Sequence, residues 1–208
     1  MLQKKAVKPD TLELLKRIST LNSLTNFALG GGTNLALRIG HRLSIDLDFF
    51  TNSEFANALI FQNITREFPT ADLLFEQNQT MMFNINGIKV DFILYPFSWL
   101  EPFDLIADSR FISITDIIPM KLQALSNRFS KKDFWDIAFL LKEVTLVKMI
   151  EIFKRKFPQI DPGFILHSLV TFEEAEKEPD PVCILPETWN GVKKKLKEAV
   201  IEYTNELL

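Results

Sequence analysis

Two aspartates separated by a single residue are the first feature of this sequence that could do chemistry. Asp46 and Asp48 lie in LSIDLDFF, residues 43–50, where alternating apolar and polar residues predict a strand. Successive side chains of a strand point to opposite faces, so Ser44, Asp46 and Asp48 are expected to share one face. Neighbouring carboxylates repel each other unless a cation lies between them. Because their hard oxygens favour Mg²⁺ or Mn²⁺, the pair predicts a divalent-metal site.

A glycine-rich turn precedes this strand. Gly30–Gly32 follow the apolar run NFAL, and we expect a helix from about Thr33 to Gly40. Glycine permits a sharp turn and close backbone approach, and the free N–H groups of a helix start attract anions. The turn is therefore a candidate seat for phosphates, with the basic residues Arg38, His41 and Arg42 adding positive charge. The candidate nucleotide-binding residues of this region are Gly31, Gly32, Thr33, Arg38, Arg42 and Ser44.

A third carboxylate, Asp91, is expected on a neighbouring strand. Asn86-Gly87 separates two β-rich runs, which is a strong hairpin signal, and Asp91 lies in the second run. Three aspartates beside a phosphate-binding turn are typical of a two-metal site for phosphoryl or nucleotidyl transfer. Each feature alone is common: glycines often form simple turns, and glycosyltransferases also use a D-x-D pair.

Bulk composition limits the alternatives. The chain has 208 residues, 47% hydrophobic and 25% charged, which is typical of a globular protein with a sizeable core. A net charge of −3 gives no global attraction to nucleic acid, so a polyanionic partner needs local basic patches. One cysteine and two histidines exclude an internal disulfide and a Cys/His metal site. Without a signal core or a long apolar run, we expect a cytoplasmic protein with no membrane partner.

The pattern of elements changes along the chain. Strand-like and helical segments alternate up to about residue 105, whereas only helical patterns follow. We therefore predict an α+β core of α/β type with a mixed sheet, residues 1–105, followed by an α-helical domain, residues 106–208.

Three quoted segments resemble one family. GGTNLALRIGHRLSIDLDFF, KVDFIL and DIIPMKLQALSNRFSKKDFWDIAFLL together closely resemble the AbiEii/AbiGii toxin family of nucleotidyltransferases, in the polymerase-β-like superfamily. The resemblance covers about residues 26–141. It implies that Gly32-Thr33 replaces a Gly-Ser pair and that Asp46 and Asp48 bind metal, with Asp91 as third carboxylate. It further implies that Lys121 contacts phosphate and that Asp133 completes the catalytic set.

Residues of the segment DIIPMKLQALSNR fit a role in phosphate binding if this segment forms a helix. Lys121, Leu125 and Arg128 fall on one helical stripe, so the two cations could form a phosphate-facing wall or a solvated face. Asp136 could cap a helix, pair with Lys132 or support the site.

The resemblance implies transfer of a nucleoside monophosphate from an NTP to an acceptor hydroxyl, with Mg²⁺ or Mn²⁺ as cofactor. The implied acceptor is tRNA or another RNA, and the implied setting is a toxin with a separately encoded antitoxin. A protein acceptor, a non-catalytic nucleotide-binding module and a nucleotide-sugar glycosyltransferase remain as alternatives.

Overall fold

The computed structural model describes residues 2–206 and divides them into two compact units. The first, the sheet unit, comprises the chain up to Gly40 together with Ser44–Ser113. The second, the helical unit, comprises His41–Leu43 and the chain from Ile114 onward. The sheet unit extends past residue 105 because two short strands before Ser113 belong to its sheet.

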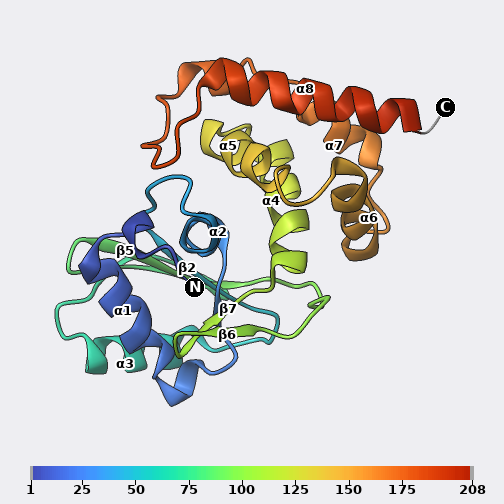
Figure 1. Ribbon diagram of the computed structural model, residues 1–208. Coiled ribbons are helices and arrows are strands. Elements are labelled where there is room, and N and C mark those ends of the chain that lie inside the picture. The colour runs from blue at the N-terminus through green and yellow to red at the C-terminus, as the bar shows by residue number, and fades with distance from the viewer. Residues whose placement is uncertain (1, 207–208) are drawn as a thin grey trace. The chain divides into compact units, whose positions relative to one another are not determined.

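One mixed sheet of seven strands organises the sheet unit, in the order β3-β4-β5-β2-β1-β7-β6. Figure 1 labels four of these strands, β2, β5, β6 and β7. β2 pairs in parallel with β5 and β1 with β7, while the other neighbouring pairs are antiparallel. The strands are β1 (Ala28–Leu29), β2 (Leu47–Thr51), β3 (Asp72–Gln77), β4 (Thr80–Ile85), β5 (Ile88–Leu94), β6 (Asp104–Ile106) and β7 (Ser109–Phe111). This arrangement confirms the mixed sheet that the sequence predicts.

The two faces of this sheet differ in chemistry. Buried side chains such as Phe49, Phe83 and Phe92 join residues of α1 (Pro9–Ser19) and α3 (Asn57–Glu67) in one apolar core. Alternation along each strand places the intervening residues, among them Asp48 and Asp91, on the opposite face. The core therefore fixes the direction in which the acidic side chains point.

Helices alone form the helical unit beyond Ile114, as the sequence predicts. Aromatic contacts join its helices; for example, Trp135 stacks on Trp189 with ring centroids 5.5 Å apart. The helices are α4 (Ile114–Arg128), α5 (Lys131–Leu140), α6 (Leu146–Lys156), α7 (Pro162–Ser168) and α8 (Trp189–Glu206), with a short 3₁₀ turn at Ala175–Lys177. The sheet unit has two further 3₁₀ turns, at Lys4–Ala6 and Asn22–Leu24. No helix within residues 2–206 is long and apolar enough to cross a membrane.

Two local expectations require correction. The helix after the glycine turn, α2 (Gly31–Ile39), begins at Gly31 rather than near Thr33. β2 begins at Leu47, so Ser44 and Asp46 precede the strand instead of alternating within it. By contrast, the Asn86-Gly87 hairpin is confirmed: both residues have positive φ, 54° and 81°, as a two-residue type I′ turn requires.

Candidate functional site

The glycine turn and the aspartate pair are in direct contact in the sheet unit. The Gly30 N–H donates to the backbone oxygen of Asp48 at 2.8 Å. Gly31, at the first position of α2, has φ +61°, which favours glycine. A Cβ at Gly31 would overlap Oδ2 of Asp48, so glycine is also required by space. The start of α2 and the carboxylate of Asp48 thus belong to one site.

Strand register brings Asp91 to the same site. Asp48 on β2 is the direct neighbour of Asp91 on the parallel strand β5. Lys89, two residues before Asp91, donates from Nζ to Asp91 Oδ2 at 2.5 Å. Lys89 is not among the site residues expected from the sequence, although its i, i+2 spacing from Asp91 on a strand already places both side chains on one face.

Electrostatics link the three carboxylates through Asp91 and Lys89. Burial raises the pKa of Asp91 above its ordinary value, the Lys89 ammonium counteracts this only in part, and the charge of Asp46 raises it further. Lys89 has a raised pKa, because the attraction of Asp91, Asp48 and Asp46 outweighs the effect of burial. The acid cluster, defined as Asp46, Asp48 and Asp91, therefore carries more negative charge than Lys89 can balance.

The donor chemistry of the acid cluster fits a hard divalent cation. All its side-chain donors are carboxylate oxygens, the ligands that Mg²⁺ and Mn²⁺ prefer. Oδ1 of Asp91 is buried without a hydrogen-bond partner, which is costly for a polar atom and is relieved by a bound cation. Within residues 2–206, no group of three or more His, Cys, Asp or Glu side chains is arranged so that it could hold a metal ion as it stands.

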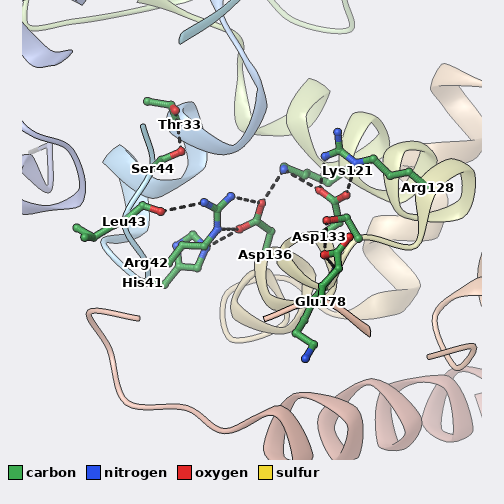
Figure 2. A network of polar contacts seen from close by, with 12 residues as sticks. Thr33, His41, Arg42, Leu43, Ser44, Lys121, Arg128, Asp133, Asp136 and Glu178 are labelled. Carbon is green, nitrogen blue, oxygen red and sulfur yellow. Dashed lines mark hydrogen bonds and ion pairs between the residues drawn. The ribbon is translucent and has the colours of Figure 1, made fainter. Parts of the chain in front are cut away.

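The hydroxyls of Thr33 and Ser44 face the protein. Thr33 is 1% exposed, and its hydroxyl donates to the backbone oxygen of Asp46. The Ser44 hydroxyl lies 2.8 Å from that of Thr33 and acts as donor, because the Thr33 proton is already used (Figure 2). These contacts fix the segment that carries Asp46 against the first turn of α2.

Arg38 is also committed to contacts within the sheet unit. Its Nε donates to Asn34 Oδ1 at 2.8 Å, and its Nη2 donates to Asp104 Oδ2 at 2.6 Å and to the Ile112 oxygen at 3.0 Å. Arg38 thereby ties the end of α2 to the β6–β7 region. These hydrogen bonds give Arg38 a structural role. The contact between Arg38 and a nucleotide stays a prediction.

Asp136 is the centre of a buried polar network in the helical unit (Figure 2). Its Oδ1 lies 2.7 Å from both His41 Nε2 and Arg42 Nε, and its Oδ2 accepts from Arg42 Nη2 at 2.9 Å. Lys121 Nζ also reaches Oδ2, at 2.6 Å. Asp136 thus pairs with cations far away in sequence rather than with Lys132, and Arg42 is engaged by this carboxylate.

Asp133 continues the same network. Lys121 Nζ lies 3.1 Å from Asp133 Oδ1, and Arg128 donates from Nε to Oδ2 at 2.6 Å and from Nη2 to Oδ1 at 2.8 Å. The side chain of Lys121 is 5% exposed and that of Arg128 is 51% exposed. The predicted stripe on α4 therefore contacts Asp133, one cation being buried and the other reaching solvent.

The charges of this network hold its carboxylates ionised. Burial opposes ionisation of Asp136, but Arg42, Lys121 and His41 together hold its pKa well below the ordinary value. Burial likewise opposes ionisation of Asp133, and Lys121 and Arg128 lower its pKa. The basic network, defined as His41, Arg42, Lys121, Arg128, Asp133 and Asp136, contains three permanent cations and two carboxylates.

The segment between α7 and α8 supports the start of α5 through Glu178. Glu178 Oε2 accepts from the Lys131 N–H and from the Ser130 hydroxyl, both at 2.8 Å. A carboxylate at a helix N-terminus is favoured by the helix dipole. Glu178 therefore anchors the start of the helix that carries Asp133 and Asp136.

The lysines of α8 do not form an isolated basic patch. Lys193 pairs with Glu176 at 2.7 Å, Lys194 with Glu198 at 3.7 Å, and Lys195 with Glu187. Each ion pair reduces the positive charge available to a polyanion. The lysine run is therefore a weak candidate for an RNA-binding surface.

The mixed sheet, the glycine turn and the carboxylates on β2 and β5 define the class of protein: a nucleotidyltransferase. The family model "Nucleotidyl transferase AbiEii toxin, Type IV TA system" matches residues 13–205. The chain belongs to this AbiEii family and is accordingly an enzyme of nucleotidyl transfer. The match confirms the resemblance and removes the non-catalytic and glycosyltransferase alternatives.

Individual relatives share the sequence or the fold of this chain. An uncharacterized protein of Aquifex aeolicus is 34% identical over 203 residues, covering 95% of this chain and 97% of the relative. MenT4, a nucleotidyltransferase toxin of Mycobacterium tuberculosis, shares the fold with a TM-score of 0.59 and 12% identity, covering 95% of this chain and 86% of MenT4. JHP933 of Helicobacter pylori has a TM-score of 0.54 and 16% identity, with 96% of each chain covered.

Proposed function

We propose that this enzyme transfers a nucleoside monophosphate from an NTP to a hydroxyl of an RNA acceptor, with tRNA as the expected substrate. We further propose a cytoplasmic location, Mg²⁺ as the cofactor and a separately encoded antitoxin as the protein that limits its toxicity. The observation that carries the catalytic part is the contact between the glycine turn at Gly31 and the carboxylate of Asp48, with Asp91 as its neighbour in register.

The acid cluster is the proposed metal site. Asp46, Asp48 and Asp91 would hold Mg²⁺ or Mn²⁺ through their carboxylate oxygens. When bound, the metal supplies charge neutralisation at the triphosphate and at the attacking hydroxyl. Lys89 holds Asp91 in place through its hydrogen bond to Oδ2, and it leaves the buried Oδ1 available for a cation.

Phosphate recognition is assigned to two sets of groups. In the sheet unit, the backbone N–H groups at Gly31 and Gly32 provide donors and the positive end of the α2 dipole. In the helical unit, Lys121 and Arg128 provide cations, and Asp133 holds both of them. A buried ammonium fixed by two carboxylates is already oriented, so less entropy is lost when it binds an anion.

Four residues receive positioning roles. Thr33 and Ser44 fix the backbone before Asp46, and Arg38 fixes the end of α2. Arg42 pairs with Asp136 and neutralises part of its charge. Lys121, which also contacts Asp136, therefore keeps positive charge that can bind a phosphate. We propose that these side chains act through the groups that they hold.

A transfer assay tests the function directly. The purified chain is incubated with Mg²⁺, total RNA and each of four labelled NTPs, and the RNA and protein fractions are then separated. We expect Mg²⁺-dependent labelling of RNA by one or more NTPs, lost when Mg²⁺ is removed by chelation. Label found only in the protein fraction would instead establish a protein acceptor, and labelling that persists without divalent cation would overturn the metal assignment.

A further inference from the structure

A row of side chains continues from the acid cluster to the outer edge of the sheet. Asp48 on β2 lies beside Asp91 on β5, Asp91 lies opposite Met82 on β4, and Met82 lies opposite Phe75 on β3. Residues in direct register across neighbouring strands share one face. The row therefore runs from two carboxylates to a thioether and then to an aromatic ring, all on the face opposite the apolar core.

The outer part of this row is accessible. Phe75 is 43% exposed, and every residue of β3 is exposed, because β3 is the edge strand of the sheet. Strands lie about 4.8 Å apart, so Phe75 is roughly 10 Å from Asp91 across two strand spacings. Leu74 and Phe75 are adjoining exposed apolar residues on this edge strand, and contiguous exposed apolar surface marks an interaction site.

We propose that Phe75 and Met82 form a stacking platform for an unpaired base of the RNA acceptor, next to the carboxylate of Asp91. This inference rests on the proposed RNA acceptor and adds where a base of that acceptor binds. An aromatic ring stacks on any base, and a thioether makes favourable contacts with the edge or face of a π-system.

Charge near the platform supports a nucleic acid as its occupant. The side chain of Lys89 is 41% exposed and lies in the neighbouring row, opposite Asn84, on the same face. A cation beside an aromatic ring is the usual combination for single-stranded nucleic acid, since the cation attracts the backbone while the ring stacks on a base. A peptide adding to β3 would need the edge backbone and Leu74 as much as Phe75.

The chain contains a matched control for Phe75. Phe61, on α3, is 42% exposed and stacks on Phe83, with ring centroids 6.4 Å apart. Phe83 belongs to the apolar core, so Phe61 covers the opposite face of the same sheet. The two phenylalanines thus share residue type and exposure but differ in the face that they occupy.

The test measures equilibrium binding of a labelled single-stranded oligoadenylate to the full chain without NTP, with Mg²⁺ present to offset the negative charge of the acid cluster. Phe75→Ala should weaken binding about 5- to 150-fold, the change expected for one base–aromatic stack of ~1–3 kcal/mol. Phe75→Trp should restore it, whereas Phe61→Ala should leave it unchanged. An abasic oligonucleotide should bind wild type and Phe75→Ala equally, and thermal unfolding of each variant verifies the fold.

Three outcomes overturn the platform. Unchanged oligoadenylate binding by Phe75→Ala would contradict the platform. If the wild type still labels RNA, the proposed RNA acceptor would nevertheless stand. If Phe75→Ala and Leu74→Ala weaken oligoadenylate binding equally and also change the oligomeric state, β3 would be a site where a protein strand adds to the sheet instead. Absence of RNA labelling by the wild type overturns the RNA acceptor itself, and the platform with it.

Discussion

The acid cluster of the sheet unit and the basic network of the helical unit both contain buried or partly buried carboxylates, but their charge balance is opposite. In the acid cluster, Lys89 pairs with Asp91, and burial raises the pKa of Asp91. Asp133 and Asp136 each contact two cations or more, and their pKa values are lowered. The sheet unit thus holds excess negative charge suited to a metal, and the helical unit holds excess positive charge suited to phosphate.

Loss of transfer on neutralising the acid cluster is the largest expected effect. Asp46→Asn and Asp48→Asn each remove a proposed metal ligand worth several kcal/mol of transition-state stabilisation, so the rate should fall by about three orders of magnitude or more. The melting temperature should stay equal or rise, because carboxylate repulsion decreases. Labelled-NTP transfer and thermal unfolding measure the two effects. The exposed Asp72→Asn on β3 is the control, and near-normal transfer by Asp46→Asn would contradict the metal assignment.

Neutralising the basic network should have the opposite effect on stability. Asp136→Asn removes the common partner of Arg42 and Lys121 and leaves buried charge uncompensated, which costs about 3–5 kcal/mol. Denaturant unfolding of the full chain measures this loss. The control Asp180→Asn removes an exposed partner of Lys131 and should change stability by less than about 1 kcal/mol. Equal stability of Asp136→Asn and wild type would show that the network is not a structural centre.

The two clusters should also respond to pH with opposite sign. The lowered pKa values of Asp133 and Asp136 mean that their contribution to stability is present above the ordinary carboxyl pKa and is lost as pH falls through the folded-state values. The raised pKa of Asp91 means that its contribution is present at low pH and is lost as pH rises through that value.

Unfolding free energies measured from about pH 3 to pH 7 compare the variants with wild type across the ordinary Asp range. Asp91→Asn should gain stability relative to wild type as pH rises, whereas Asp136→Asn should lose it. If the free energies of unfolding of Asp91→Asn and Asp136→Asn changed with pH in the same way, the two clusters would not differ in their electrostatics.

The smallest expected effect concerns Lys89. Because its side chain is 41% exposed, Lys89→Gln should change stability by less than about 1 kcal/mol. Loss of the ammonium should raise the pKa of Asp91 further, since Lys89 is the group that lowers it. A carboxyl NMR titration of Asp91 in both proteins measures this shift. An unchanged or lower pKa in Lys89→Gln would mean that Lys89 does not balance the acid cluster.

The site could be predicted from sequence where the signal is local. The Asn86-Gly87 turn sets the β4–β5 hairpin, and alternation along β5 then fixes the face of Asp91. Glycines before a helix identified the turn at Gly31, although not its contact with Asp48 Oδ2. The alternating pattern of residues 43–50 predicts Ser44 on the strand face, whereas β2 begins only at Leu47.

Sequence alone determined the order of motifs, the hairpin and the change from a mixed sheet to helices, because turn chemistry and hydrophobic periodicity act over a few residues. Tertiary structure alone decided which charges meet. Arg42 and Asp136 are separated by 94 positions along the chain, yet Asp136 binds this guanidinium instead of the nearby Lys132. A helix or strand pattern fixes the face on which a charged side chain lies, whereas its partner depends on which distant element packs against that face.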